Sequence, residues 1–341
     1  MRTILVAYSF GYNQRFGFSG IDRYSQELNE GLTKIGYKHN AYEYGRSGVL
    51  KRLFSTPKAV RGYDVIHLTQ PHGYEAFLNT KAKKILTWHD NMIFTRKSKT
   101  QFFNIFRGLM VYSLADTITF NSQQSFSELK DYVSTYKKFD ENKTYDITPL
   151  PLEDIWIKAK VNKKQERRGF IYIGAINYPH KNFKGLFGAY QEICDNIHST
   201  QKPPLRIFTS SPNANGILQE TAEELKINIS SYPIVLYERK SDKEILPMLR
   251  QSIALLHLSF EEGYGLPLME SIAVGTPVIT LVEAKIPEET KKWTIATSNP
   301  VEEALKLYSK PRSASQEAIS YAKSLTKENY ARKMVKLYKG V

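Results

Sequence analysis

The stretch that decides the fold runs from residue 259 to residue 270 and reads Ser259-Phe260-Glu261-Glu262-Gly263-Tyr264-Gly265-Leu266-Pro267-Leu268-Met269-Glu270. The apolar run 253–258 before it has the length of a buried strand. Gly263 and Gly265 give the backbone the freedom that a tight turn or a close ligand requires. Pro267 suits the first turn of a helix, and the apolar run 278–282 predicts the next strand. The order strand, glycine turn, helix, strand predicts a βαβ unit whose helix N-terminus can receive an anion.

Two carboxylates frame this unit, Glu262 at the turn and Glu270 one turn into the helix. A lone Glu at such a place is most often a helix-capping residue. The pair around Gly-Tyr-Gly-Leu-Pro instead resembles the mark of the retaining glycosyltransferases of family 4, two glutamates separated by seven residues around Gly-Phe-Gly-Leu-Pro, with Tyr264 in place of Phe. The resemblance implies that Glu262 orients the transferred sugar and Glu270 binds the ribose of the donor. It also implies a donor site along Glu262, Gly263, Tyr264, Gly265, Leu266 and Glu270.

Composition bounds the class of protein. The chain has 341 residues, of which 41% are hydrophobic and 12% aromatic, so two globular domains are expected. No window holds eighteen consecutive apolar residues, and the first seven residues are typical of a strand and not of a signal peptide. The single Cys194 excludes an internal disulfide, and the His and Cys residues show no zinc-ligand spacing.

The formal net charge of +14 is compatible with several partners. Nucleic acid, an anionic membrane and a phosphorylated substrate all attract a basic protein, and a solvated lysine-rich surface explains the charge equally well. The sequence contains no zinc finger, RNA-recognition signature or basic zipper. Nucleic acid is therefore not an expected partner, although a basic nucleic-acid-binding protein stays as the less favoured alternative.

The first half of the chain begins as an α/β domain. A strand at 4–7 and a glycine- and aromatic-rich loop at 11–20 precede a helix that starts at Ile21. In the family this loop lies beneath the donor diphosphate, which makes Gly20 an expected donor-binding residue. The strand 84–88 leads to His89-Asp90, at the strand end where α/β proteins keep their chemistry. A loop histidine bonded to a backbone carbonyl is the ordinary interpretation; the resemblance makes His89 a catalytic candidate that faces the sugar.

The segment 95–115 mixes basic and aromatic residues. Arg96, Lys97, Lys99 and Arg107 occur in the same segment as Phe102, Phe103 and Phe106. Such a helix is typical of an element that seeks an anionic lipid surface. A core helix with a solvated edge is the alternative, and the pattern does not separate the two.

The second half opens with a strand at 170–174 and a loop at 175–182 that resembles the family's phosphate loop. Lys181 takes the place of the lysine that pairs with the donor phosphates, and His180 stands beside it. Ala175 departs from the arginine often found there. Glu238 follows the strand 234–237, in a segment against which the nucleobase packs in relatives.

The resemblance covers nearly the whole chain and predicts an α/β fold with two Rossmann-like domains facing across a cleft, called GT-B. We expect an acceptor-side domain at 1–155, a charged linker at 156–168, a nucleotide-sugar domain at 169–323 and a C-terminal helix at 324–341 that crosses back to the first domain. The chain is expected to be cytoplasmic, or peripheral on the cytoplasmic face of a membrane.

The expected activity is retaining transfer of a sugar from a UDP- or GDP-sugar to a hydroxyl of a glycan or lipid-linked glycan. The expected catalytic residues are Glu262, His89 and Lys181. Neither a cofactor nor a divalent metal is expected, because the sequence has no Asp-x-Asp pair to hold one. A non-catalytic nucleotide-sugar-binding relative is the alternative, favoured by Ala175 and by the lack of glycines after Thr209.

Overall fold

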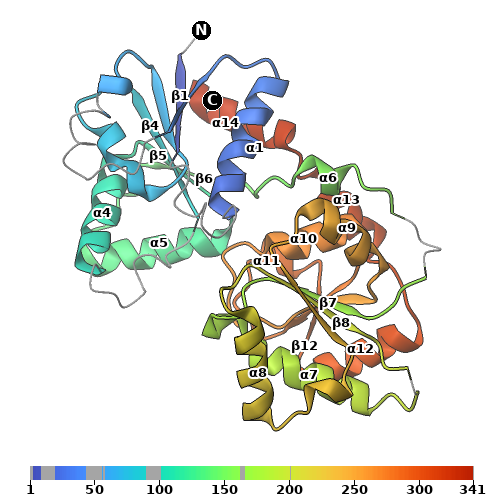
Figure 1. The fold of residues 1–341 in the computed structure, drawn as a ribbon. Coiled ribbons are helices and arrows are strands. Elements are labelled where there is room, and N and C mark those ends of the chain that lie inside the picture. The colour runs from blue at the N-terminus through green and yellow to red at the C-terminus, as the bar shows by residue number, and fades with distance from the viewer. Residues whose placement is uncertain are drawn as a thin grey trace. The chain divides into compact units, whose positions relative to one another are not determined.

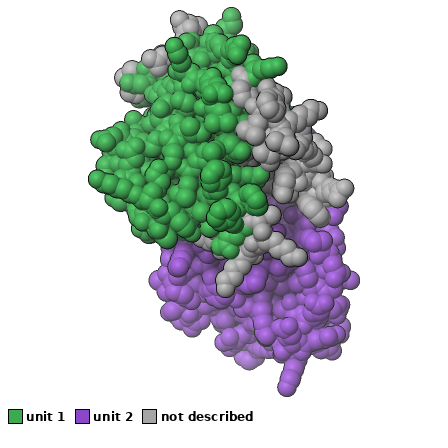
Figure 2. All heavy atoms as spheres, turned by 90° about the vertical axis from the view of Figure 1, so that its left-hand side faces the viewer, with its two compact units in different colours: residues 1–151, 325–341 green, residues 152–324 purple. Residues whose placement is uncertain are grey.

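A computed structural model describes residues 3–8, 20–43, 56, 58–89, 101–161, 166–199 and 201–340. Parallel sheets with helices against them make up the chain (Figure 1). It divides into two compact units, coloured separately in Figure 2. Unit 1 comprises residues 1–151 and 325–341, and unit 2 comprises residues 152–324. The predicted fold class, α/β with two Rossmann-like domains, is confirmed.

Unit 1 is built on a parallel sheet in the order β2-β1-β3-β4-β5-β6. The inner strands β3 and β5 are buried along their whole length, as expected where helices cover both faces of a sheet. The strands are β1 (Ile4–Tyr8), β2 (Asn40–Glu43), β3 (Val65–Leu68), β4 (Lys83–Trp88), β5 (Thr117–Phe120) and β6 (Thr144–Ile147). The helices are α1 (Gly20–Lys34), the 3-10 helix η1 (Pro71–Phe77), α4 (Gln101–Leu114), α5 (Gln123–Tyr136) and α14 (Lys327–Lys339).

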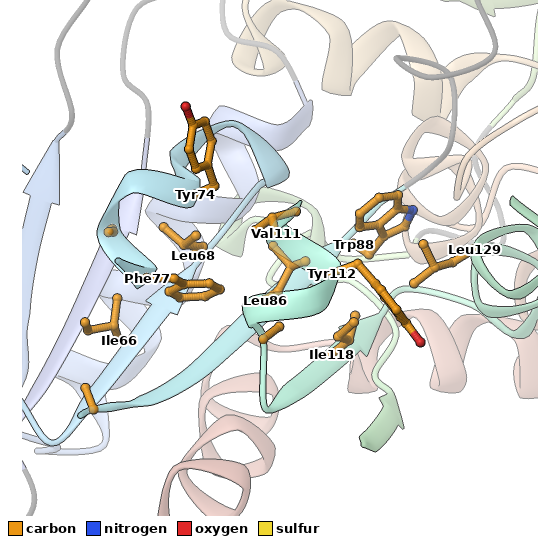
Figure 3. Close-up of a cluster of buried hydrophobic side chains, with 14 of the residues drawn as sticks. Ile66, Leu68, Tyr74, Phe77, Leu86, Trp88, Val111, Tyr112, Ile118 and Leu129 are labelled. Carbon is orange, nitrogen blue, oxygen red and sulfur yellow. The ribbon is translucent and has the colours of Figure 1, made fainter. Parts of the chain in front are cut away.

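The core of unit 1 lies where η1 and α4 cover β3 and β4 (Figure 3). Trp88 is fully buried at the end of β4. The cluster includes Ile66 and Leu68 on β3, Leu86 and Trp88 on β4, Tyr74 and Phe77 on η1, and Val111 and Tyr112 on α4. This packing fixes the end of β4, which the next residue, His89, follows.

The C-terminal helix α14 belongs to unit 1 and packs against α1. Lys327 is almost fully buried and forms ion pairs with Glu27 and Glu30 of α1. Farther along, the Tyr338 hydroxyl lies 2.8 Å from Nδ1 of His67 on β3. The helix is therefore held to the sheet by buried polar contacts as well as by its apolar face.

Unit 2 is a second parallel sheet, in the order β12-β11-β10-β7-β8-β9. The chain starts in the middle at β7, builds outward to β9, and then returns to the other side of β7 with β10. This is the doubly wound order, and its reversal point lies between β7 and β10, where such sheets bind ligands. The strands are β7 (Phe170–Ile173), β8 (Leu205–Thr209), β9 (Ile234–Glu238), β10 (Ala254–His257), β11 (Val278–Leu281) and β12 (Ile295–Thr297).

Helices of unit 2 connect these strands. The longer ones are α7 (Phe183–Asp195), α8 (Ala214–Leu225), α9 (Asp242–Gln251), α10 (Leu266–Ala273), α12 (Pro300–Ser309) and α13 (Gln316–Ser324). The shorter ones are α6 (Asp154–Ile157), η2 (Pro179–Lys181), η3 (Ile229–Ser231) and α11 (Glu288–Lys291).

The division between the units falls after Pro151, whereas the sequence predicts a domain end at 155 and a linker at 156–168. Trp156 is buried on α6. Arg167 is also buried, and its guanidinium donates to the carbonyl oxygens of Ser252 and Gly275 at 2.8 and 2.7 Å. Both residues therefore belong to the packing of unit 2.

Candidate active site

The strand order of unit 2 brings Lys181 and Glu262 together, although they are 81 residues apart in the sequence. Lys181 ends η2, which follows β7, and Glu262 lies in the turn that follows β10. Because β7 and β10 are parallel neighbours, their carboxyl ends open at the same edge of the sheet. The site therefore lies at the reversal point of the doubly wound sheet.

Glu262 is the centre of the site. Its side chain is 8% exposed, and Lys181 Nζ donates to both carboxylate oxygens, at 2.7 Å to Oε1 and 2.8 Å to Oε2. His257 Nε2 lies 2.7 Å from Oε1. Burial by itself raises the pKa of Glu262. His257 and Lys181 together lower this pKa by more than burial raises it, so it lies well below its ordinary value. The carboxylate is therefore ionised at neutral pH.

The turn that carries Glu262 is anchored by backbone hydrogen bonds on both sides. Phe260 N donates to the His180 carbonyl at 2.8 Å, and Glu262 N donates to the Lys285 carbonyl at 2.9 Å. Asn182 adds a side-chain link, since its Nδ2 donates to the Leu258 carbonyl at 2.9 Å. Hydrogen bonds therefore connect the loop that carries Lys181 to the turn that carries Glu262.

Gly265, the residue directly before α10, lies in the left-handed region with φ of 83°, a conformation that favours glycine. Tyr264, Met269 and Glu270 are buried around this turn, and Gly263 and Leu266 are partly exposed. The predicted βαβ unit is confirmed, with β10, α10 and β11 at the expected places. The N-terminus of α10 follows β10 at the same strand edge as Lys181, and Glu270 lies buried on this helix.

The remaining predicted donor residues of unit 2 lie on neighbouring loops. His180 stacks on Tyr178, with ring centroids 5.6 Å apart. Glu238 ends β9 with an exposed side chain. In the sheet, β9 lies two strands away from β7. At Ala175 the carbonyl accepts the Tyr172 hydroxyl at 2.7 Å.

His89 and Gly20 lie in unit 1. His89 follows β4 and is 6% exposed, and its Nε2 donates to the Thr69 carbonyl at 2.9 Å. Its own carbonyl accepts from Ser125 Oγ at 2.8 Å and from Asn121 Nδ2 at 3.1 Å. Ring and backbone are therefore fixed at the carboxyl edge of the sheet. Gly20 is the first residue of α1; the loop before it and Asp90 lie outside the described residues.

Sequence reasoning missed His257 and Asn182. His257 stood inside the apolar run 253–258 as its one polar residue, and that interruption is the signal that could have identified it. Asn182 follows the loop lysine and adopts a left-handed conformation at the start of α7, with φ of 50°. An Asn directly before a predicted helix is itself a cap signal.

The helix expected within 95–115 is α4, and its first half exposes aromatic residues. Phe102, Phe103 and Phe106 are 76%, 63% and 52% exposed, while Val111 and Tyr112 are buried in the core. Arg96, Lys97 and Lys99 lie outside the described residues. Among the described residues, no helix is long and apolar enough to cross a membrane, and no group of three or more His, Cys, Asp or Glu side chains is placed to hold a metal ion.

Comparison with known proteins matches residues 154–309 to the family model of the glycosyl transferases group 1. The matched range lies inside unit 2 and includes Lys181, His257, Glu262 and Glu270. The O-antigen chain mannosyltransferase RfbU of Salmonella typhimurium is 23% identical over 173 residues, which make up 46% of this chain and 46% of that protein. The aligned part is thus about half of each. Both matches are to glycosyltransferases.

Solved structures share the fold over the whole chain. Sucrose-phosphate synthase from Thermosynechococcus elongatus superposes with a TM-score of 0.72 at 14% identity, covering 100% of this chain and 99% of that one. Anabaena HepE in complex with UDP and glucose gives a TM-score of 0.69 at 12% identity, covering 100% of both chains. The fold is that of the GT-B glycosyltransferases.

Proposed function

We propose that the chain is a retaining, family 4-type glycosyltransferase. Residues 154–309 match the family model of the glycosyl transferases group 1, and Lys181 and Glu262 meet at the reversal point of the sheet. The chain transfers a sugar from a nucleotide-sugar donor, a UDP- or GDP-sugar, to a hydroxyl of a glycan acceptor. The observation that carries the proposal is the buried contact of Lys181 with both oxygens of Glu262, at 2.7 and 2.8 Å.

The leaving group of this reaction is a nucleoside diphosphate, whose developing charge must be stabilised. Lys181 supplies a cation on a loop held by Asn182, and the N-terminus of α10 supplies a partial positive charge. These two groups support diphosphate binding without a divalent metal. Glu270, buried on α10, binds the ribose hydroxyls, and Glu262 accepts hydrogen bonds from the sugar.

The proposed reaction needs no nucleophile from the protein. The bond between the anomeric carbon and the diphosphate oxygen breaks, and the acceptor oxygen bonds to the same face of that carbon. The departing phosphate takes the acceptor's proton. His89 of unit 1 is the third catalytic candidate, and its bond to the Thr69 carbonyl fixes the orientation of its ring.

The test is a thermal-shift screen with UDP-, GDP-, ADP- and dTDP-sugars, since a ligand that binds only the folded state raises the melting temperature. We expect stabilisation by UDP- or GDP-sugars. Lys181→Met should weaken the nucleotide affinity by roughly 10- to 100-fold through loss of a charge-assisted bond. Lys184→Met is the matched control, because Lys184 is exposed on α7 and pairs with Glu224. Equal affinity of the two variants, or no response to any donor, would contradict the proposal.

We further propose that the acceptor is a lipid-linked glycan at an anionic membrane surface, with the protein peripheral on the cytoplasmic face. Unit 1 carries 26 of the 48 Lys and Arg residues and 14 of the 34 Asp and Glu residues, so +12 of the formal +14 belongs to it. The same unit exposes the three phenylalanines at the start of α4. Exposed aromatic rings on a basic unit favour a lipid surface over a soluble partner.

A further inference from the structure

His257 contacts the same carboxylate as Lys181, from inside the sheet. It is the last residue of β10, whose other residues are Ala254, Leu255 and Leu256, and it is 1% exposed. Its Nε2 lies 2.7 Å from Glu262 Oε1, and the Ser259 hydroxyl lies 3.3 Å from the same nitrogen. Because an ionised carboxylate can only accept, Nε2 carries the hydrogen and donates to Glu262.

The imidazole is not explained by packing. Among the described residues, its Nδ1 is buried and has no hydrogen-bond partner. A buried polar atom without a partner is destabilising, so an apolar side chain would suit this strand position better than histidine. The bond from Nε2 to Glu262 is therefore the contact that accounts for a histidine here.

We propose that His257 is a positioning residue that holds Glu262 in place when Lys181 turns from the carboxylate to the diphosphate of the donor. This inference rests on the proposed function. Within the described residues, Oε2 accepts only from Lys181, whereas Oε1 accepts from both Lys181 and His257. When Lys181 moves to the diphosphate, Oε2 becomes free to accept a sugar hydroxyl while Oε1 stays bonded to His257.

The His257 ring is held more firmly than the Lys181 side chain. His257 lies at the end of a strand that is hydrogen-bonded on both sides, and Tyr172 of β7 stacks beside it with an interplanar angle of 21°. Lys181, by contrast, ends a short 3-10 helix and has a flexible four-carbon side chain. The histidine bond is the one that persists through donor binding, and the lysine bond is the one that exchanges.

Three substitutions test the role. His257→Leu removes the hydrogen-bond donor to Glu262 and matches the apolar residues of the strand. His257→Gln keeps an N–H near the position of Nε2. His257→Asn is polar but too short to reach the carboxylate. We would measure kcat and KM for hydrolysis of UDP-glucose and GDP-mannose, the Kd of UDP and GDP, and the melting temperature. We expect kcat to fall about 10- to 100-fold in the Leu and Asn variants, with nucleotide Kd unchanged, and the Gln variant to recover most of kcat.

Thr280→Val is the matched control for packing. Thr280 lies opposite His257 on β11, is fully buried, and bonds to the Thr294 hydroxyl at 2.7 Å. We expect this variant to lower the melting temperature without changing kcat. If the Leu variant does not fold, the comparison of Gln with Asn decides, and equal kcat values overturn the inference. A wild type that binds and hydrolyses neither donor overturns the proposed function itself, and this inference with it.

Discussion

Glu262 keeps a negative charge in a nearly buried position because three hydrogen bonds from Lys181 and His257 compensate it. A buried carboxylate without such partners would be neutral at pH 7. In the proposed reaction Lys181 can move from the Glu262 carboxylate to the diphosphate of the sugar donor, which is a second anion. The site is thus charged and nearly buried.

The first prediction compares two adjacent glutamates. Glu262→Gln should lower turnover by more than ~100-fold, because the neutral amide cannot replace a charge that acts on the transition state. It should also lower the melting temperature, because it leaves Lys181 partly buried without its counter-charge. Glu261→Gln is the control, since Glu261 is exposed and should keep near-normal turnover. Turnover and thermal denaturation of both variants would check this, and an active Glu262→Gln enzyme would contradict the assigned role.

The sequence could predict that Lys181 and Glu262 matter, because each takes a place in a motif that resembles the family 4 glycosyltransferases. It could not show that they touch. That contact depends on β10 returning to the side of β7, where Ala254 pairs with Phe170 across 84 residues of sequence. His257 was harder still, since a lone histidine in an apolar strand is compatible with ordinary core packing.

At the scale of elements, the packing of α14 against α1 leaves no room for a side chain at Gly31. A Cβ there would meet the Lys327 carbonyl closer than real Cβ contacts occur. Gly31→Ala should therefore destabilise the protein, although alanine favours helices by ~1 kcal/mol over glycine. Gly188→Ala on α7 is the matched control, because a Cβ there meets nothing within 4 Å, and this variant should be slightly more stable. Denaturant unfolding of the two variants measures the contrast; stabilisation by both would show that α14 does not pack tightly at Gly31.

The buried network beneath α14 predicts acid sensitivity. His67 bonds to Tyr338 and Thr87, and burial, with a smaller effect from His89, lowers its pKa to about 3. In the unfolded chain the pKa is near the ordinary value of about 6.5. Between these values the unfolded state binds the extra proton, so stability falls as the pH drops below about 6.5, by up to ~1.4 kcal/mol per pH unit.

His67→Gln tests this contribution, because glutamine can hydrogen-bond but does not titrate. The difference in unfolding free energy between the wild type and His67→Gln should shrink as the pH falls from 7 to 4.5. Urea denaturation at each pH gives that difference directly. A difference that is constant across the range would show that His67 does not titrate on unfolding.

Elements with local signals were predictable from the sequence, and those set by tertiary contacts were not. Ser241 and Glu244 form a capping box at the start of α9, and their spacing of three residues is a signal in the sequence itself. The helix expected within 95–115 is described from Gln101, and its pattern alone could not say whether the phenylalanines point inward. Their exposure depends on which face of α4 meets η1 and β4, a choice made by the whole unit.

At the scale of the whole molecule, the positive charge is concentrated in one unit. Unit 2, which holds the proposed donor site, has a formal charge of +2, whereas unit 1 has +12. The proposed donor site needs only local cations such as Lys181, so it does not account for the charge of unit 1. A basic unit that exposes rings at Phe102, Phe103 and Phe106 is consistent with the proposed anionic bilayer.

The last prediction is that the protein binds anionic vesicles reversibly and that salt weakens the binding. Each Lys or Arg close to such a surface contributes about 1 kcal/mol, and at physiological salt the attraction is screened beyond ~8 Å. Replacing Phe102, Phe103 and Phe106 with serine should reduce co-sedimentation with phosphatidylserine vesicles, because the rings no longer enter the interface. The control replaces Val235 and Val282, which are 41% and 51% exposed in unit 2, and should bind as the wild type does. Equal binding of all three proteins would remove α4 from the contact. No binding to anionic vesicles at low salt would refute the membrane proposal and leave the glycosyltransferase proposal intact, because that proposal rests on unit 2.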